Sequence, residues 1–364
     1  MKKCSFTIVA KNYIGLGLIL EQSLQKFHKS DIDFYIFVAD EIDASQITIP
    51  ENVISVKKIS DYTDAEWTDM TFKYDLTEFC TSIKPFCFQY IFSKGYDSAL
   101  YFDPDICIFS PITEILEKLE TYDVVLTPQV SGIHINYTGE HPEWAMNVNG
   151  IFNLGFCGMR KTPISQKILS WWRERLKNEC FVDRSVGDFT DQKWMDWLPA
   201  LLGNEHLYVI KNLGMNMAPW NYFERELFLK DGNIMVRFRT NDNETKEDQL
   251  VFLHFAGYDY GKMKQGIISR KRIENLEKKP NIAVLGIKGD EASLTYIKRI
   301  EKNCEKYGIG FTLKLALNED EFVENFDKIK NDENFTGIMF QQPLSKKMSN
   351  LINEIPAEKD IEGV

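Results

Sequence analysis

Two carboxylates, Asp103 and Asp105, interrupt an otherwise apolar stretch at residues 98–109, which reads SALYFDPDICIF. Placing carboxylates beside so much apolar surface costs free energy unless a counter-charge or hydrogen bonds compensate them. A divalent cation with oxygen ligands is a common compensation in proteins. Asp-Pro-Asp is also ordinary turn chemistry, so the tripeptide alone leaves a metal site and a simple turn as alternatives.

The elements around these aspartates alternate between strand and helix. The patterns predict strands at 6–10, 33–39, 98–102 and 123–127, and helices at 14–27, 80–94 and 111–121. This order is typical of the α/β class, with a mostly parallel central sheet and helices on both faces. Ligands of such sheets bind beyond the carboxyl ends of the strands. Asp103 and Asp105 fall at such an end.

Composition narrows the classes of function. The formal net charge is −11, which argues against a nucleic-acid partner, because nucleic-acid binding depends on concentrated Lys and Arg. The seven cysteines form no Cys-x-x-Cys pair, so neither a zinc site nor a disulfide framework is indicated. The sequence predicts a cytoplasmic protein for three reasons. Its cysteines are expected to be free thiols, and it has no apolar segment of membrane-spanning length. Its N-terminal apolar run is broken by Lys11 and Asn12, which argues against a signal peptide.

Composition changes after residue 260, and a new cycle of strands and helices begins after Pro280. We therefore expect two domains, residues 1–278 and residues 279–364, the second a small α/β unit. Between them, residues 262–279 are rich in Lys and Arg with helical spacing of apolar residues. A solvated helix is the simpler interpretation, and peripheral contact with a membrane stays open, as does oligomerisation.

Several further motifs accompany the aspartates in an informative order. They are Asn12-Tyr13 after the first strand, Asp103-Pro-Asp105, Phe152-Asn-Leu-Gly155, Asp191-Gln192 and His254-Phe-Ala-Gly257. With these motifs, residues 1 to about 275 resemble bacterial glycosyltransferases of the nucleotide-diphospho-sugar transferase fold, in the style of the glycogenin and lipopolysaccharide galactosyltransferase family.

The resemblance implies a role for each of these motifs. Asp103, Asp105 and His254 would bind Mn²⁺ or Mg²⁺, which suits mixed carboxylate and imidazole ligands. The donor's nucleotide and diphosphate would contact Asn12, Tyr13 and Gly257. The hydroxyls of the donor sugar would be held by Asn153, Asp191 and Gln192, with Gln192 beneath the anomeric carbon.

Simpler interpretations stand beside these roles. His254 could be a hydrogen-bonded core residue, and Asp191 could be the N-cap of a helix that we expect at residues 191–202. Lys84, at the start of the helix before the metal strand, could reach the diphosphate or be a solvated lysine. We expect Trp194 and Trp197 to be core residues, and Trp220 to be the better candidate for a platform under an acceptor sugar.

Four stretches after Pro280 form a second informative series: Gly289-Asp-Glu-Ala-Ser-Leu-Thr-Tyr296, Cys304-Glu-Lys-Tyr-Gly308, Gly337-Ile-Met-Phe-Gln-Gln-Pro-Leu344 and Glu358-Lys-Asp-Ile-Glu-Gly363. They resemble the N-terminal catalytic half of the bifunctional methylenetetrahydrofolate dehydrogenase/cyclohydrolase. By this resemblance, Tyr296 and Gln341 fall on that family's folate-site tyrosine and glutamine. However, the family's catalytic lysine is Ile300 here, and an aliphatic side chain cannot transfer a proton. The folate-anchoring aspartate becomes Glu362. We therefore interpret this unit as inactive or truncated.

The sequence thus predicts a metal-dependent glycosyltransferase. It would move a sugar from a nucleotide diphosphate donor, for which the family resemblance implies UDP, to a glycan or to a lipid- or protein-linked acceptor. Retention of configuration follows from the resemblance alone. The alternatives are a folate-dependent one-carbon enzyme with an accessory front domain, and a non-catalytic module that binds nucleotide sugars.

Overall fold

The computed structural model describes residues 1–41, 50–140, 142–239, 246–258, 281–288, 297–298, 300–302, 304–305, 309–341, 344–356 and 359–360. The chain divides into two compact units, Met1–Ala256 and Gly257–Val364. The basic segment at 262–279 lies outside the described residues, as do Tyr296 and Glu362. Among the described residues, no helix is both long and apolar enough to cross a lipid bilayer.

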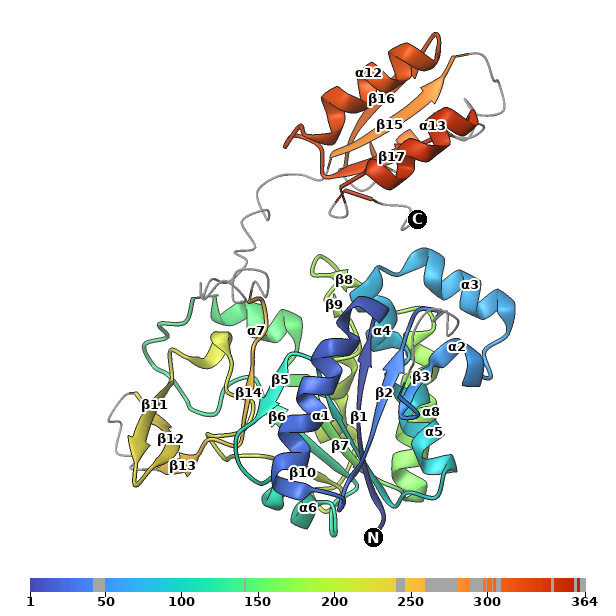
Figure 1. The fold of residues 1–364 in the computed structure, drawn as a ribbon. Coiled ribbons are helices and arrows are strands. Elements are labelled where there is room, and N and C mark those ends of the chain that lie inside the picture. The colour runs from blue at the N-terminus through green and yellow to red at the C-terminus, as the bar shows by residue number, and fades with distance from the viewer. Residues whose placement is uncertain are drawn as a thin grey trace. The chain divides into compact units, whose positions relative to one another are not determined.

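A seven-stranded sheet forms the centre of the first unit (Figure 1). Its strands, in spatial order, are β10 (Leu207–Val209), β6 (Val124–Pro128), β7 (Phe152–Arg160), β4 (Ser98–Phe102), β1 (Lys3–Val9), β2 (Asp33–Val38) and β3 (Val53–Ser55). β7 runs antiparallel to both of its neighbours, and every other pairing in the sheet is parallel. The predicted mostly parallel sheet is confirmed.

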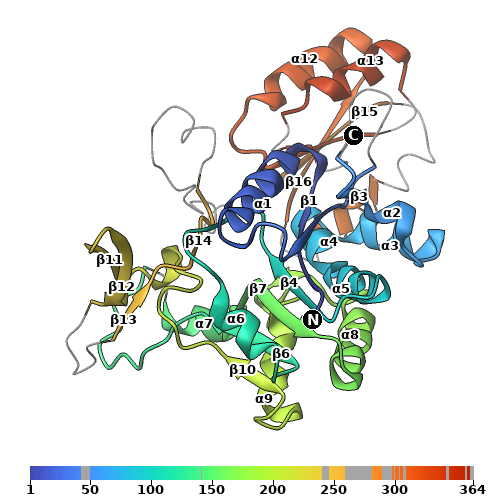
Figure 2. The same cartoon turned by 60° about the horizontal axis from the view of Figure 1, so that its bottom comes forward.

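Helices cover both faces of this sheet, as Figures 1 and 2 show. The strands alternate between the two cores: Tyr101 of β4 packs with helices α5 (Lys84–Ser93) and α8 (Pro163–Leu176), whereas Phe102 faces α1 (Ile14–His28). This alternation is the two-residue period of a strand. Because both faces are covered, the central strands consist almost entirely of apolar residues.

Besides the short β8–β9 pair, two smaller sheets extend the first unit in its described residues. β14 (Phe252–His254) pairs antiparallel with β5 (Ile106–Ile108), so a late segment returns to the strand that follows the aspartates. The other sheet is antiparallel and contains β11 (Arg225–Lys230), β12 (Asn233–Phe238) and β13 (Glu247–Gln249). The first of these pairings determines the position of His254.

The remaining elements of the first unit are short. They are η1 (Lys11–Tyr13), α2 (Val56–Ile59), α3 (Asp64–Lys73), α4 (Leu76–Ser82), α6 (Thr113–Lys118), α7 (Glu143–Asn149), β8 (Val182–Asp183), β9 (Asp188–Phe189), η2 (Lys193–Trp197), α9 (Leu198–Leu201) and η3 (Pro219–Asn221). Residues 191–202, which we expected to form one helix, contain the 3-10 turn η2 and then α9. Trp197 is consequently exposed, so its expected place in the core is wrong, whereas Trp194 packs edge to face against Trp171.

The second unit is a small parallel sheet with helices. Its strand order is β16 (Gly310–Ala316), β15 (Asn281–Ile287) and β17 (Gly337–Phe340), accompanied by α12 (Glu319–Lys330), α13 (Lys346–Asn350) and η5 (Leu351–Glu354). Phe322 and Phe326 of α12 pack on Phe340, each ring pair with centroids 5.1 Å apart. The predicted C-terminal α/β unit is confirmed.

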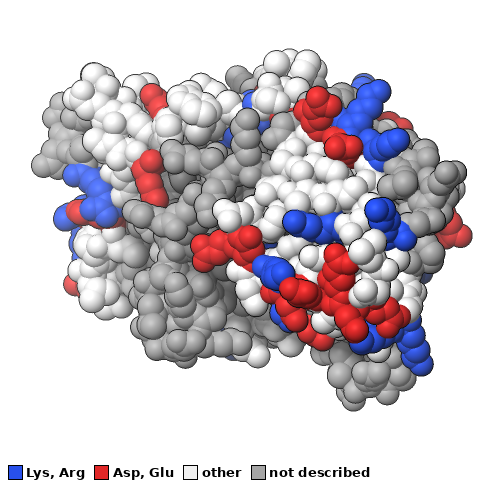
Figure 3. Space-filling view, turned by 90° about the horizontal axis from the view of Figure 1, so that it is seen from above, with Lys and Arg blue, Asp and Glu red and all other residues white. Residues whose placement is uncertain are grey.

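Charged side chains are mixed on the surface. On the face shown in Figure 3, Lys and Arg lie next to Asp and Glu and do not gather in one basic area among the residues coloured there. On α12, for example, Lys328 pairs with Glu324 at 2.6 Å and Lys330 with Asp327 at 2.6 Å.

Candidate metal and donor site

Asp103 and Asp105 lie at the carboxyl end of the central strand β4. The backbone N–H of Asp103 donates to the Gly155 carbonyl of β7 at 2.8 Å. The chain then turns, with the Ile106 N–H donating to the Asp103 carbonyl at 3.0 Å, and enters β5. This turn holds the two aspartates side by side, so the turn and the metal site proposed from sequence are compatible.

His254 reaches the aspartates because β14 pairs with β5. The last residue of β14 lies opposite Ile106, and the Phe255 N–H donates to the Asp105 carbonyl at 2.8 Å. The His254 Nε2 atom is 3.1 Å from Asp105 Oδ1 and 3.6 Å from Asp103 Oδ2. One ligand atom from each of the three residues lies within 4.8 Å of the others.

This arrangement fits a divalent cation. Adjacent ligands of an octahedral Mg²⁺ ion, each at about 2.1 Å from the metal, are about 3 Å apart. The two carboxylates keep 28% and 23% of their side-chain surface exposed, so the cluster is accessible, whereas the imidazole is buried. Two carboxylates and one imidazole are ligands that Mn²⁺ and Mg²⁺ accept.

The cluster also has an unbalanced charge. Burial raises the pKa of Asp103, and Lys84 and His254 oppose that rise. Burial lowers the pKa of His254, but Asp105 and Asp103 outweigh this and hold it above its ordinary value. With the nearby Asp191, three carboxylates face one ammonium and one imidazole, so the group stays net negative even when His254 is protonated. Such a group attracts a cation.

Gly155 lies against the His254 imidazole. A Cβ atom at this position would be 2.4 Å from Cε1 and 2.7 Å from Nδ1 of His254. The ring therefore occupies space that any other residue would fill. The glycine of the Phe-Asn-Leu-Gly motif is required here for close approach.

Asn153 and Gln192 form a hydrogen-bonded pair beside the cluster. Gln192 Oε1 accepts from the Leu154 N–H at 3.1 Å and from Asn153 Nδ2 at 3.4 Å, and its Nε2 donates to the Asn149 carbonyl at 2.7 Å. Asn153 Oδ1 accepts from the Gly155 N–H at 3.1 Å. The structure brings these two predicted residues together and gives them structural partners.

Lys84 and Asp191 form a buried ion pair. Lys84 Nζ is 2.5 Å from Asp191 Oδ2, donates to the Leu154 carbonyl at 3.0 Å, and lies 4.0 Å from the centroid of the Tyr101 ring. Lys84 is not a solvated lysine and Asp191 is not an N-cap, since both side chains are buried and bonded to each other. The Tyr101 hydroxyl in turn donates to Asp103 Oδ1 at 2.5 Å, which links this pair to the proposed metal ligands.

Asn12, Tyr13 and Gly257 are exposed. β1 and β4 are parallel neighbours, so their carboxyl ends lie at the same edge of the sheet. The turn that contains Asn12 and Tyr13 comes after β1 at this edge, and Asp103 comes after β4. Gly257 has a φ of +75°, a conformation that favours glycine. Their roles in nucleotide binding stay predictions.

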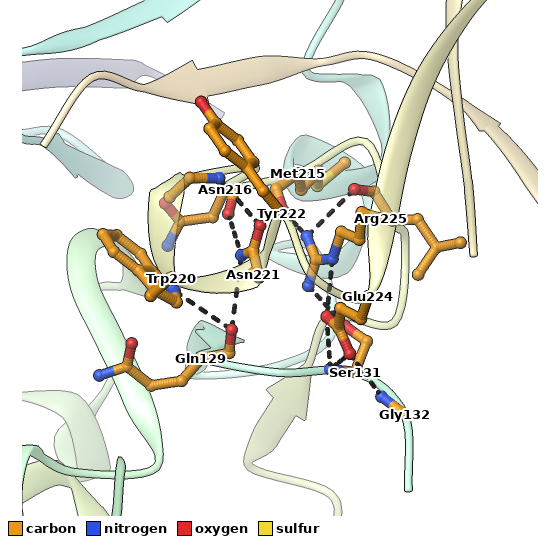
Figure 4. Close-up of polar contacts among 12 residues, drawn as sticks. Gln129, Ser131, Gly132, Met215, Asn216, Trp220, Asn221, Tyr222, Glu224 and Arg225 are labelled. Atoms are coloured by element: carbon orange, nitrogen blue, oxygen red, sulfur yellow. Dashed lines mark hydrogen bonds and ion pairs between the residues drawn. The ribbon is translucent and has the colours of Figure 1, made fainter. Parts of the chain in front are cut away.

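Trp220 packs against the imidazole of His254. Its ring is nearly perpendicular to that of His254, with centroids 5.2 Å apart, and its Nε1–H donates to the Gln129 carbonyl at 3.2 Å. A buried ion pair, Glu224 with Arg225, anchors the same segment (Figure 4). Glu224 accepts from the Ser131 N–H, and Arg225 donates to the Met215 carbonyl at 3.0 Å.

Sequence reasoning did not find Asn216. Its side chain is buried and lies between the Asn153 amide and the His254 ring, with Nδ2 3.0 Å from Asn153 Oδ1 and Oδ1 3.3 Å from His254 Nδ1. Its φ of +54° is a conformation in which asparagine is enriched. No motif in the sequence marked this position.

Comparison with known proteins separates the two parts of the chain. Residues 261–362 match the family model "Tetrahydrofolate dehydrogenase/cyclohydrolase, catalytic domain". Bifunctional protein FolD of Clostridium tetani is 34% identical over 99 residues, which are 26% of this chain and 36% of that protein. The resemblance seen in the C-terminal sequence is confirmed.

The front part is similar to other proteins. Uncharacterized protein YfnF of Bacillus subtilis is 26% identical over 186 residues, half of this chain and 58% of YfnF. The chain therefore spans less than two thirds of YfnF and of the FolD protein. Among solved structures, the galactosyltransferase LgtC in complex with donor and acceptor sugar analogs is 15% identical, with a TM-score of 0.41 over 70% of this chain and 87% of LgtC.

The contact of Gly155 with the imidazole leads to a first prediction. Gly155→Ala should weaken Mn²⁺ binding by roughly 10- to 100-fold, because the new methyl group displaces His254 from the two carboxylates. Calorimetric titration of Mn²⁺ measures this change. Gly158→Ala is the matched control in the same strand, since its Cβ would meet the flexible end of Leu119 at 3.2 Å and the Phe156 ring at 3.4 Å, and not His254. Equal affinity of both variants and the wild type contradicts the prediction.

The buried ion pair leads to a second prediction. Lys84→Met should lower the free energy of unfolding by about 3–5 kcal/mol, because Asp191 is left as an unpaired buried charge. Lys84→Met/Asp191→Leu should recover most of this loss. Urea unfolding followed by tryptophan fluorescence measures it in the first unit, where all seven tryptophans lie.

The same variant should respond to pH in a defined direction. Burial raises the pKa of Asp191, and Lys84 opposes this rise. Without Lys84 the folded protein binds the Asp191 proton more tightly than the unfolded chain does, so the stability of Lys84→Met falls as pH rises. The difference in the free energy of unfolding between the wild type and Lys84→Met should therefore be smallest at acid pH. Lys57→Met, which removes an exposed pair with Glu41, should leave the unfolding midpoint unchanged. A deficit independent of pH contradicts the assignment.

Proposed function

We propose that the first unit is a cytoplasmic, metal-dependent glycosyltransferase. It transfers a sugar from a nucleotide diphosphate donor, for which we propose UDP, to a glycan or to a lipid- or protein-linked acceptor. The observation that carries this proposal is the convergence of Asp103, Asp105 and His254 at the carboxyl edge of a parallel sheet. That edge is where α/β sheets of this kind bind their ligands.

The proposed chemistry requires the charge that this site provides. Breaking the bond between the anomeric carbon and the diphosphate places negative charge on the departing nucleotide. A bound Mn²⁺ or Mg²⁺ ion neutralises such charge as a Lewis acid. In our proposal Asp103, Asp105 and His254 hold that ion, and the exposed edges of both carboxylates leave room for the diphosphate.

The donor sugar is proposed to lie against Asn153, Asp191 and Gln192. In this proposal Lys84 neutralises Asp191 and stabilises the wall of the pocket, because its ammonium is buried and does not reach outward to a diphosphate. Retention of configuration is part of the proposal and follows from the family resemblance. No side chain is assigned as a nucleophile.

The acceptor is proposed to bind near Trp220. This ring is half-buried and packs beside His254, which places it next to the proposed metal ligands. An aromatic face offers the apolar contact that sugar rings accept.

For the second unit we propose a non-catalytic role. Its resemblance to the folate enzymes covers the fold, but Ile300 replaces the family's catalytic lysine. We propose that this unit serves for docking or oligomerisation. Such a role depends on the surface of the folded unit and does not require the catalytic lysine.

The first unit's function is tested by nucleotide release. Purified protein with Mn²⁺ and a panel of nucleotide sugars should release nucleotide diphosphate, and Asp105→Ala should reduce the rate about 100-fold or more by removing a charged metal ligand. Asp97→Ala, at the exposed opposite end of the same strand region, serves as the control and should keep full activity. An unimpaired Asp105→Ala enzyme refutes the metal role.

Two further assays separate the alternatives. The folate-dependent alternative predicts spectrophotometric oxidation of methylenetetrahydrofolate, whereas Ile300 predicts no signal. A binding module without catalysis predicts that UDP binds in calorimetry, independently of metal and without turnover. A folate signal overturns the proposed non-catalytic role of the second unit, and metal-independent UDP binding without turnover overturns the proposed transferase.

A further inference from the structure

A chain of side-chain amides runs from the backbone of β7 to the imidazole of His254. Asn216 connects the two ends, donating from Nδ2 to Asn153 Oδ1 at 3.0 Å and to Thr127 Oγ1 at 2.8 Å. Its Oδ1 atom lies 3.3 Å from His254 Nδ1. Asn216, Thr127 and His254 are all buried, so water does not compete for these contacts.

Backbone groups determine which atom donates and which accepts in each hydrogen bond of this series of amides. The orientation of an Asn or Gln amide is normally inferred from its partners. Here the Gly155 N–H, which can only donate, faces Asn153 Oδ1 and so identifies that atom as the oxygen. The Leu154 N–H does the same for Gln192 Oε1, which then accepts from Asn153 Nδ2.

The same logic extends to Asn216. Because Asn153 Oδ1 can only accept, the atom of Asn216 that faces it must be the NH₂ group. The Thr127 hydroxyl donates to the Asn153 carbonyl at 3.3 Å, so it is free to accept from the same NH₂ group. The oxygen of Asn216 is therefore the atom turned toward His254.

We infer that Asn216 is a positioning residue that fixes the tautomer of His254. An amide oxygen only accepts, so His254 Nδ1 must carry a proton, and Nε2 is left as the nitrogen that can bind a metal ion beside Asp103 and Asp105. This inference rests on the proposed metal site and deepens it. Outer hydrogen bonds of this kind orient metal-binding histidines and increase metal affinity.

Other contacts near Nδ1 restrain the ring but offer this nitrogen no acceptor. Gly155 leaves space for the imidazole, and the Trp220 ring packs on it, yet neither presents an acceptor to Nδ1. Asn216 itself is held by Asn221, whose Nδ2 donates to the Asn216 carbonyl at 2.9 Å. Asn216 Oδ1 thus lies at Nδ1, whereas the other ring nitrogen, Nε2, lies 3.1 Å from Asp105 Oδ1, where a metal ion would replace the proton.

The experiment compares the full-length wild type with Asn216→Ala, Asn216→Asp and Asn212→Ala. Asn212 is the matched control, since its side chain bonds Glu114 and the Gly214 N–H in the same segment without contacting His254. Electron paramagnetic resonance of free Mn²⁺ gives the dissociation constants. Asn216→Ala should bind Mn²⁺ about 10- to 100-fold more weakly, and Asn212→Ala should bind like the wild type.

A second readout separates positioning from mere structural support. Nitrogen-15 spectra of labelled histidine in Mg²⁺-saturated protein distinguish Nδ1–H from Nε2–H, and the chain has only five histidines. The wild type and Asn216→Asp, which keeps an acceptor oxygen, should show Nδ1–H for His254, whereas Asn216→Ala should show a mixture.

The outcomes separate the two proposals. Weaker Mn²⁺ binding of Asn216→Ala with an unchanged tautomer overturns the positioning role, as does unchanged affinity. A wild type that binds neither cation overturns the metal site itself, and the inference with it.

Discussion

The structure depends on how a group of buried charges at one edge of the sheet is compensated. Asp103, Asp105 and Asp191 lie within one connected cluster, and Lys84 and His254 are its cationic partners. Isolated carboxylates in such an environment would be protonated. Lys84 and His254 oppose the rise that burial causes in the pKa of Asp103, and Lys84 opposes it for Asp191. Asp103 and Asp105 are partly exposed, which places these two carboxylates on the accessible side of the cluster.

Tyr101 couples the two halves of this cluster. Its ring lies under the Lys84 ammonium, and its hydroxyl donates to Asp103. The side chain lies on the face of β4 that α5 and α8 cover, so the core on that face positions both the ion pair and one proposed metal ligand. Packing on the sheet and charge at its edge are therefore not independent, because moving Tyr101 changes the surroundings of both.

The sequence allowed the prediction of features that depend on local pattern. Strand and helix alternation predicted the sheet, and Asp103-Pro-Asp105 was correctly expected at a strand end. The expected helix at 191–202 was wrong, since this segment forms a 3-10 turn and one short helix. Local spacing of apolar residues cannot reveal that Asp191 is drawn into a buried pair with a lysine more than 100 residues earlier in the chain.

The site residues that could not be predicted are those defined by long-range contacts. Asn216 has no recognisable spacing to its partners, because Thr127, Asn153 and His254 come from three different strand regions. Gly155 was part of a motif, but the reason for it, the imidazole lying where its Cβ would be, becomes visible only once β14 pairs with β5. In both cases the partner is chosen by strand pairing and not by sequence neighbours.

In our proposal, the second unit keeps a fold similar to the tetrahydrofolate dehydrogenase/cyclohydrolase catalytic domain without that domain's catalysis. In the described residues, its core consists of residues within its own span, among them Phe322, Phe326 and Phe340. Ile300 is not among the buried core residues of this unit. Replacing a lysine at such a position removes a proton-transferring group at little cost in packing. Stability and catalysis can therefore separate here, whereas in the first unit the same buried charges serve both the fold and the proposed site.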